Sequence, residues 1–382
     1  YNLDFSEAIE KLAGEYGIAL EKREYNDNRE LYYQVNRLTA NFFYKVFTET
    51  ANKGYPYMKR RGISPAILKK FGIGYADEKW DSLYQYLKSQ GVDTKIMVEL
   101  GLVSESKGKY YDKFRNRVMF PIINTSGKVI GFGGRAINPD DNPKYLNSPE
   151  SKIFQKKNNL YGLNISRQNV GKDGYIILVE GYMDAVALHQ YGFDCAVASL
   201  GTSLTEEHAT LLTRYTEQVV LIYDGDQAGQ NATQRAIPLL EKAGLQVKVL
   251  QMKEAKDPDE FLKKFGADRF KLLLEESSNR VEYQLRAIIR KYDMNQDEDR
   301  VKFISEASDF ICTLPSAVQR EVYGTRAAEA AGITYEAIKL EINKAYKRRT
   351  AREKKKQERI DLTKDPTAMS RINEAAEKAK IE

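Results

Sequence analysis

The first part of the chain combines helical segments with a β-hairpin. Apolar residues recur at helical spacing over residues 4–52 and again over residues 64–71, and this spacing predicts amphipathic helices. Two apolar runs, at residues 118–123 and 129–134, flank a turn that contains a glycine, which is typical of a β-hairpin. The pattern predicts a mixed α/β N-terminal subdomain over residues 1–170.

In the middle of the chain, short apolar runs alternate with helical segments. Strands of this kind that alternate with helices predict a mainly parallel sheet flanked by helices, and we place this α/β domain over residues 171–277. Within it, residues 203–206 (Ser-Leu-Thr-Glu) fit the capping-box pattern, so we expect a helix to begin at Ser203. The predicted strands cover residues 175–179, 195–198, 219–223 and 247–250.

The last part of the chain has only helical patterning. Apolar residues at helical spacing continue over residues 278–346, which predicts a small helical bundle. The tail over residues 347–382 is rich in charged residues and has few large apolar ones. Such a composition is typical of a solvated helix end that runs into a polar linker. Binding of nucleic acid by this basic tail is the alternative interpretation.

Length and composition restrict the class of protein. A chain of 382 residues is too long for one ordinary core, so two or three subdomains are expected. No apolar run approaches the ~20 residues that span a bilayer, and no secretory leader is visible, so we expect a cytoplasmic protein without a membrane partner. The chain begins at Tyr1 rather than at a methionine, from which we expect a fragment of a longer protein.

Cysteine and histidine are too few to form a zinc site. Cys195, Cys312, His189 and His208 are the only such residues and are not spaced as ligands of one ion. Any metal in this chain must therefore be bound by oxygen. The net charge of +6 permits a polyanionic partner, but only the distribution of the basic residues can support one.

Acidic residues follow the strands of the predicted parallel sheet. They lie in the segments 180–184 (Glu-Gly-Tyr-Met-Asp), 224–226 (Asp-Gly-Asp) and 257–259 (Asp-Pro-Asp). The carboxyl ends of neighbouring parallel strands form one crevice, so we expect these side chains to converge. Carboxylates gathered in this way repel one another, and hard divalent cations relieve the repulsion. The sequence therefore predicts a divalent-metal site at this edge of the sheet.

A simpler interpretation of each acidic segment stays open. Asp224 and Asp226 could cap the helix that follows them, and residues 257–259 could be a turn that begins a helix. Residues 201–203 (Gly-Thr-Ser) could offer backbone amides to a phosphate or form a plain turn. Taken together, acidic segments at several strand ends of one sheet favour the metal site.

A second group of candidate residues is basic and lies around the predicted hairpin. Basic groups with glycine and aromatic residues between them suit a surface that grips phosphates through charge and backbone amides. A solvated basic face is the alternative. The basic candidates are Lys113, Arg115 and Arg117 before the first hairpin strand, Arg135 after the second, Lys144 in the segment 144–149 (Lys-Tyr-Leu-Asn-Ser-Pro), and Lys156 and Lys157.

Several of these segments together resemble one family. The toprim domain of bacterial replicative DNA primases of the DnaG type is similar to this chain at 180–184, at 198–202 (Ala-Ser-Leu-Gly-Thr), at 224–226 and at 257–259. The basic N-terminal part of the RNA polymerase domain of the same enzymes resembles three further segments, and the resemblance extends from residue 1 to about residue 345. These segments are 117–122 (Arg-Val-Met-Phe-Pro-Ile), 131–135 (Gly-Phe-Gly-Gly-Arg) and 144–150 (Lys-Tyr-Leu-Asn-Ser-Pro-Glu).

The resemblance implies a role for each candidate group. The acidic residues are implied to bind Mg2+ or Mn2+, with two or more ions in the site, and Glu180 to act either as a general base or as a further ligand. The basic residues are implied to contact nucleotide, primer or template. The implied acidic site is Glu180, Asp184, Asp224, Asp226, Asp257 and Asp259, with Glu180, Asp224 and Asp226 as catalytic residues, and the implied binding residues are Arg61, Arg115, Arg117, Arg135, Lys144, Asn147 and Lys156.

The resemblance also implies an activity and partners. The chain is expected to be a primase catalytic core that synthesises short RNA primers on single-stranded DNA from ribonucleoside triphosphates at the replication fork. Guanosine alarmones are implied as inhibitors that occupy the nucleotide site. The zinc-binding module and the helicase-interaction domain of the family are expected to lie outside this chain, so no zinc is expected, and the replicative helicase is expected to bind through a missing C-terminal domain.

Other functions share parts of the pattern. A haloacid-dehalogenase-like phosphatase also places Asp-x-Asp after an apolar strand, and its chemistry would make Asp224 a covalent nucleophile. A non-catalytic nucleic-acid-binding scaffold would bind DNA without dependence on Mg2+. A toprim nuclease or a type IA topoisomerase would share the acidic cluster, but a topoisomerase needs a large further domain for which this chain has no room.

Overall fold

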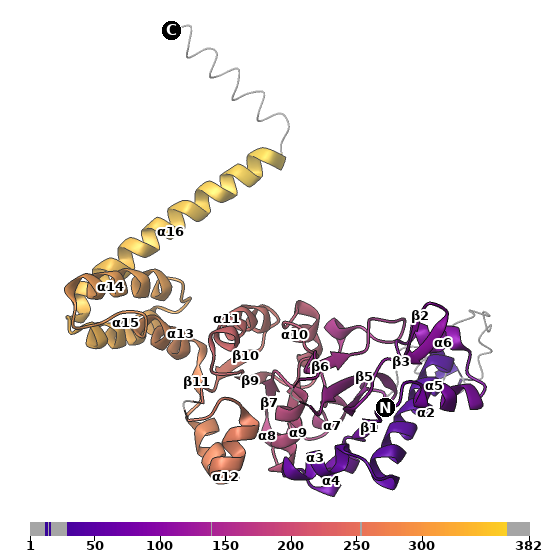
Figure 1. The fold of residues 1–382 in the computed structure, drawn as a ribbon. Coiled ribbons are helices and arrows are strands. Elements are labelled where there is room, and N and C mark those ends of the chain that lie inside the picture. The colour runs from indigo at the N-terminus through magenta and orange to yellow at the C-terminus, as the bar shows by residue number, and fades with distance from the viewer. Residues whose placement is uncertain (1–11, 14, 17–28, 139, 253, 365–382) are drawn as a thin grey trace. The chain divides into compact units, whose positions relative to one another are not determined.

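The structure is a computed structural model that describes residues 12–13, 15–16, 29–138, 140–252 and 254–364 (Figure 1). Most of the helix expected before residue 29 lies outside the described residues. The chain divides into two compact units, one that ends at Ser277 and one that begins at Ser278. Each unit is described by itself.

The first unit begins with helices and an antiparallel sheet. The expected hairpin is confirmed: β4 pairs antiparallel with β5, and Phe120 lies opposite Gly133. The strands are ordered β1-β4-β5-β6, and α2 packs against β1 and β5. The bounds are α2 (Arg29–Glu49), α3 (Gly54–Arg60), α4 (Pro65–Lys70), β1 (Gly74–Ala76), α5 (Ser82–Ser89), α6 (Thr94–Glu99), β2 (Val103–Ser106), β3 (Lys109–Asp112), β4 (Arg117–Ile123), β5 (Val129–Ala136), β6 (Tyr145–Asn147), η1 (Lys156–Asn158), α7 (Leu163–Ser166) and α8 (Val170–Asp173).

A parallel sheet follows in the same unit, as the alternating pattern predicts. Its strands lie side by side in the order β10-β9-β7-β8 and are parallel. The helices α9 and α12 contact each other, as do α10 and α11, and the two pairs cover opposite faces of the sheet (Figure 1). The bounds are β7 (Ile176–Val179), α9 (Tyr182–Gln190), β8 (Ala196–Ala198), α10 (Glu206–Leu212), β9 (Gln218–Ile222), α11 (Gln227–Lys242), β10 (Gln246–Val249) and α12 (Pro258–Glu275).

The expected start of one helix is wrong. Helix α10 begins at Glu206 rather than at Ser203, and its N-cap is Thr205. The Thr205 hydroxyl accepts a hydrogen bond from the His208 backbone N–H, and Nδ1 of His208 accepts one from the Thr205 backbone N–H. The capping box is therefore present two residues later than expected, because the imidazole of His208 takes the place that glutamate or glutamine usually fills.

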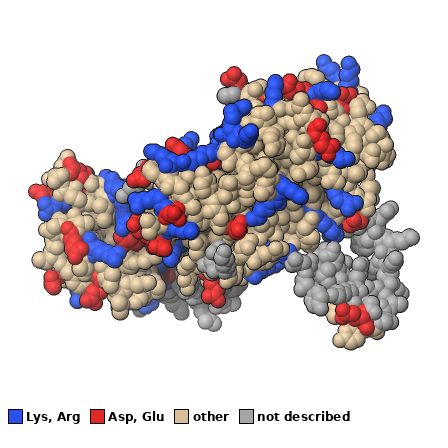
Figure 2. Space-filling view, turned by 90° about the horizontal axis from the view of Figure 1, so that it is seen from below, with Lys and Arg blue, Asp and Glu red and all other residues tan. Residues whose placement is uncertain are grey.

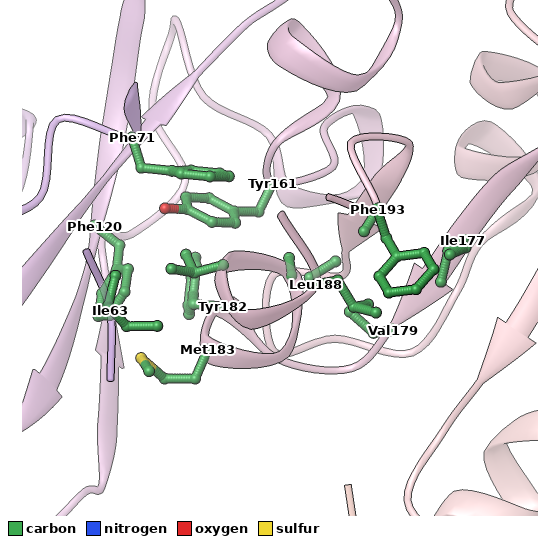
Figure 3. Packing of buried hydrophobic residues seen from close by; sticks show 14 of the residues in the cluster. Ile63, Phe71, Phe120, Tyr161, Ile177, Val179, Tyr182, Met183, Leu188 and Phe193 are labelled. Atoms are coloured by element: carbon green, nitrogen blue, oxygen red, sulfur yellow. The ribbon is translucent and has the colours of Figure 1, made fainter. Parts of the chain in front are cut away.

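One hydrophobic core joins the two sheets of the first unit. Tyr182 of α9 stacks on Phe120 of β4 with 5.3 Å between ring centres, and it packs edge-on against Tyr161 at 4.7 Å. Figure 3 shows these rings between the antiparallel strands and α9. The same cluster includes Ile177 and Val179 of β7. The shared core fixes the antiparallel sheet and its basic residues against the parallel sheet that carries the acidic segments.

The unfolding free energy of the first unit is expected to fall as the pH decreases from about 6.5 to about 4. His189 is buried, its Nε2 lies 3.0 Å from the carbonyl oxygen of Ala196, and burial lowers its pKa to about 4. The unfolded chain takes up the proton near pH 6.5, so protonation favours unfolding below that pH, by up to ~3 kcal/mol.

Urea denaturation at pH 7.5 and at pH 5 measures this effect. His189→Asn, which carries no titrating group, is the control and should lose part of the pH dependence. If the variant and the parent chain lose the same unfolding free energy between the two pH values, the prediction is wrong.

The second unit is helical, as expected for the C-terminal part of the chain. After a short strand, β11 (Ser278–Asn279), four helices pack around buried residues that include Phe303, Ile311, Ala327 and Ile338. Helix α16 continues through the first half of the basic tail. None of the described helices has both the length and the apolar character needed to cross a bilayer. The helices are α13 (Arg280–Ile289), α14 (Asp297–Ile311), α15 (Ala317–Ala331) and α16 (Tyr335–Lys364).

Candidate acidic site and its basic surroundings

The acidic residues lie at the carboxyl edge of the parallel sheet. Glu180 follows β7, and Asp224 follows β9, its neighbour in the sheet. Oε1 of Glu180 accepts a hydrogen bond from the backbone N–H of Asp224 at 3.2 Å, so the ends of the two strands are joined. Asp184 lies in the first turn of α9, and Asp257 is the N-cap of α12. The parallel topology therefore brings together segments that are about eighty positions apart.

The carboxylates of this edge raise the pKa of one another. Burial, and then the negative charges of Asp257 and Asp224, raise the pKa of Asp184 to about 8. The pKa of Glu180 is raised by burial and by the charge of Asp224. Burial and then Asp257 and Asp226 raise the pKa of Asp224. Such mutual repulsion between half-buried carboxylates is what a divalent cation relieves.

Two glycines let the backbone approach the carboxylates closely. A Cβ atom on Gly229 would lie 2.1 Å from the carbonyl oxygen of Asp224, and a Cβ atom on Gly181 would lie 2.8 Å from Oδ2 of Asp184. No other residue fits at Gly229 without movement of the backbone. Sequence analysis missed Gly229, although a glycine in the first turn of the helix after Asp226 was a usable signal.

The helix caps of the simpler interpretation are present at this edge. Oδ1 of Asp226 accepts a hydrogen bond from the Gly229 backbone N–H at 2.8 Å, and Oδ1 of Asp257 accepts one from the Glu260 backbone N–H at 2.8 Å. Both residues are therefore helix caps, as the simpler interpretation holds. Each cap occupies one of the two oxygens of its carboxylate, and it thereby fixes the position of the other oxygen.

Asp259 is buried and is neutralised by two cations. Its Oδ2 accepts from Nη1 of Arg61 at 2.9 Å and from Nζ of Lys263 at 2.7 Å. Its Oδ1 is buried and has no hydrogen-bond partner among the described residues. The structure thus places Arg61, which was expected at the nucleotide, in contact with the acidic segment of α12. An orphaned carboxylate oxygen here suits a nearby cation.

The acidic side chains do not yet surround a common point. Within the described ranges, no three histidine, cysteine, aspartate or glutamate side chains are already arranged as ligands of one ion. The donor set is nevertheless of the right chemistry, because hard divalent cations take carboxylate oxygens and keep several waters. Direct ligation of one ion by three of these carboxylates would therefore require a change in their arrangement.

Two of the expected phosphate-binding arginines hold local structure. Nη1 of Arg117 donates to the carbonyl oxygens of Gly134 and Pro143, at 3.2 and 2.8 Å, and Arg117 is buried. The guanidinium of Arg115 lies over the ring of Trp80, 4.3 Å from its centre. A cavity of about 640 Å³ is lined by both arginines. Figure 2 shows basic side chains gathered beside acidic ones on one face of the molecule.

Arg135 and Asn147 link different parts of the first unit. Nε of Arg135 donates to the hydroxyl of Tyr57 at 2.6 Å, and Arg135 is buried. Nδ2 of Asn147 in β6 donates to the carbonyl oxygen of Leu200 at 2.8 Å, and its Oδ1 accepts from the hydroxyl of Tyr182 at 2.8 Å. The contacts of Asn147 fasten the antiparallel sheet to the part of the chain that carries the parallel sheet, and the contact of Arg135 ties β5 to α3.

The two expected lysines have different surroundings. Lys144 lies close enough to Asp224 for its charge to lower the pKa of that carboxyl, against the larger effect of burial. Burial and then the charge of Lys156 lower the pKa of Lys113. The charge of Lys144 therefore acts on the acidic edge, whereas that of Lys156 acts on a second lysine, which was a candidate from the sequence pattern alone.

Comparisons with known proteins match this arrangement. A family described as the N-terminal domain of the DNA primase catalytic core matches residues 42–167, and a Toprim-like family matches residues 177–262. The DNA primase of Clostridium acetobutylicum is 40% identical over 344 residues, which cover 88% of this chain and 57% of that protein. The chain spans between 51% and 63% of the length of the first curated relatives.

Solved structures agree in fold and in extent. A DNA primase domain from Pseudomonas aeruginosa is 36% identical with a TM-score of 0.67, and the match covers 82% of this chain and 99% of that one. A DnaG primase catalytic domain bound to single-stranded DNA is 34% identical with a TM-score of 0.68, and the match covers 80% and 97%. The chain belongs to the DnaG-type DNA primases and covers their catalytic core.

One expectation about the extent of the chain is wrong. A family described as the DnaB-helicase binding domain of primase matches residues 281–335, so a region similar to that domain lies within this chain. The matched residues run from α13 to the first residue of α16. Sequence analysis missed this assignment because the region shows only apolar residues at helical spacing, which any helical bundle requires.

Proposed function

We propose that this chain is the catalytic core of a DNA primase that synthesises short RNA primers on single-stranded DNA from ribonucleoside triphosphates. The proposal is supported by membership of the family and by the acidic edge, where half-buried carboxylates repel one another. The observation that carries it is the hydrogen bond from the Asp224 backbone N–H to Glu180, which joins two carboxylate-bearing strand ends. Asp184 lies close enough to both carboxylates for their charges to add to burial in raising its pKa, and a group of this kind suits divalent cations.

The acidic residues have distinct roles in this proposal. The residues that would hold Mg2+ or Mn2+ are Asp224, Asp226 and Asp257, with Asp184 and Asp259 beside them. A bound divalent ion would stabilise the charge of the triphosphate during in-line attack by the primer 3′-hydroxyl. The pKa of Glu180 is raised, which suits a general base for that hydroxyl, and ligation is its alternative role. The helix caps at Asp226 and Asp257 fix these side chains before substrate binds.

The basic residues would bind the polyanions. Arg61, which is paired with Asp259, and Lys144, whose charge acts on Asp224, would meet a triphosphate at the acidic edge. Arg115, Arg117, Arg135, Asn147 and Lys156 would shape and line the path of primer and template. The related DnaG catalytic domain that is bound to single-stranded DNA supports the same partner here. The match over residues 281–335 supports helicase binding by the second unit.

Incorporation of labelled ribonucleotide on a single-stranded template tests the proposal. We expect product that depends on the template and on Mg2+ or Mn2+, and that is lost on addition of a chelator. Incorporation without a template or without a divalent ion would overturn the proposal. Trapping of a phosphorylated Asp224 would instead favour the phosphatase, and DNA binding that is indifferent to Mg2+, with no product, would favour the scaffold.

The apparent affinity for Mn2+ is expected to rise between about pH 6 and about pH 8. Below its pKa of about 8, the Asp184 carboxyl holds a proton that a divalent ion must displace, so each pH unit changes the affinity by up to about tenfold. Calorimetric titration in two buffers of different ionisation enthalpy measures the released proton. Asp184→Asn should lose this release, and an unchanged release in that variant would show that another group supplies the proton.

A further inference from the structure

Four interactions connect the start of helix α10 to the turn at residues 156–159. Nε2 of His208 lies 2.7 Å from the carbonyl oxygen of Lys156 and 3.1 Å from that of Asn159. The hydroxyl of Thr205 donates to the carbonyl oxygen of Lys157 at 3.3 Å. Nζ of Lys157 forms an exposed ion pair with Glu207 at 2.9 Å. The turn follows the antiparallel sheet in the chain, whereas α10 lies between strands β8 and β9 of the parallel sheet.

The imidazole of His208 performs two tasks at once. Its Nδ1 accepts from the Thr205 backbone N–H at 3.2 Å, which requires an unprotonated Nδ1. The proton then resides on Nε2, which faces the two carbonyl oxygens of the turn and donates to them. His208 is wholly buried, so neither task can be taken over by water without a cost. The residue therefore completes the helix cap and fastens the turn through opposite sides of one ring.

The fastened turn carries Lys156, whose charge acts on Lys113. Lys113 is half-buried, and its pKa is lowered by burial and by Lys156. Neither lysine forms an ion pair with another described residue. The carboxylate of Glu150 accepts a hydrogen bond from the Lys156 backbone N–H at 3.0 Å. The Lys156 ammonium group, which has no ion-pair partner among the described residues, is therefore available to a phosphate.

We propose that His208 is a positioning residue, which from α10 holds the turn at residues 156–159 and so places Lys156 for binding a phosphate. This inference rests on the proposed function, in which Lys156 contacts nucleotide, primer or template. His208 touches no substrate and acts only through the turn. The toprim part of the chain thereby sets the position of a basic group that belongs to the preceding segment.

Two substitutions separate the tasks of His208. His208→Gln offers an oxygen for the Thr205 backbone N–H and an amide N–H for the turn. His208→Glu keeps the acceptor that completes a capping box but places a carboxylate against the carbonyl oxygens of Lys156 and Asn159. We expect kcat/KM for ribonucleotide incorporation to fall by no more than about threefold in His208→Gln and by about tenfold or more in His208→Glu.

A double-mutant cycle with Lys156→Ala decides the mechanism. If His208 acts through Lys156, His208→Glu lowers kcat/KM in the parent chain but causes no further loss in Lys156→Ala. His208→Leu is tested in the same cycle, because it removes the hydrogen bonds to the turn without burying a charge. A folding defect that is specific to the glutamate variant then cannot decide the result. Thermal denaturation of each variant reports the structural effect separately.

Several outcomes would overturn the inference. Equal losses in the glutamine and glutamate variants would mean that the ring serves another purpose, and losses that add to those of Lys156→Ala would show an effect independent of that lysine. Full activity of Lys156→Ala itself would remove Lys156 from the proposed function and the inference with it. Absence of template-dependent incorporation by the parent chain would instead defeat the proposed function as a whole.

Discussion

Replacement of Asp224 by asparagine is expected to lower ribonucleotide incorporation by about 10³-fold or more while the fold is retained. Asp224 stands at the end of β9, next to Glu180, and burial and the charges of Asp257 and Asp226 raise the pKa of its carboxyl. Removal of one negative charge relieves this repulsion, so the melting temperature without divalent ion should stay the same or rise. Stabilisation by Mg2+ should decrease in the variant, because our proposal makes Asp224 a ligand of the ion.

Asp268→Asn is the matched control for this prediction. Asp268 is an exposed aspartate of α12, outside the acidic edge, and the same change there should leave incorporation and the response to Mg2+ unaltered. Single-turnover incorporation and thermal denaturation, each at several Mg2+ concentrations, measure both effects. Full activity of Asp224→Asn would remove Asp224 from the proposed site.

Replacement of Gly229 by alanine is expected to lower the unfolding free energy by about 3 kcal/mol and to impair incorporation strongly. The added Cβ would lie 2.1 Å from the carbonyl oxygen of Asp224. Because this oxygen belongs to the backbone, it cannot rotate away as the end of a side chain could. The start of α11 must move away from the end of β9. Such a shift separates Asp226, whose cap bond ends on the Gly229 backbone N–H, from Asp224.

Gly171→Ala is the control for this substitution. Gly171 also lies in a helix, in α8, and an added Cβ there would meet no atom within 4 Å. Alanine has the higher helix propensity, so this variant should be as stable as the parent chain or slightly more so. Urea denaturation of the two variants compares them directly. A Gly229→Ala chain as stable as Gly171→Ala would mean that the strand end and the helix separate easily.

The same residues serve folding and the proposed chemistry at the acidic edge. Asp226 and Asp257 cap α11 and α12 and, in our proposal, hold divalent ions. The positive ends of the two helix dipoles favour negative charge at these positions, which offsets part of the repulsion among the carboxylates. This explains how the acidic segments can be gathered in a folded chain before any ion binds.

Local pattern was sufficient for the hairpin, for the parallel strands, for the C-terminal helices and for the family. The hairpin of β4 and β5, the parallel strands and the C-terminal helices follow from apolar spacing, because a strand or a helix repeats its exposure every two or 3.6 residues. The acidic segments were located for a related reason. In a parallel sheet, every segment that follows a strand leaves at the same edge, so topology alone indicates that residues 180, 224 and 257 share it.

Only the tertiary structure decided which side chains pair. Asp112 of β3 accepts from the backbone N–H groups of Leu83 and Tyr84 and so caps α5 from another element. Arg61 binds Asp259 across 198 positions, and His208 fastens the turn that carries Lys156. Sequence patterns describe each element by its own periodicity. A contact between elements depends on how the shared core orients them, and no local spacing records that orientation.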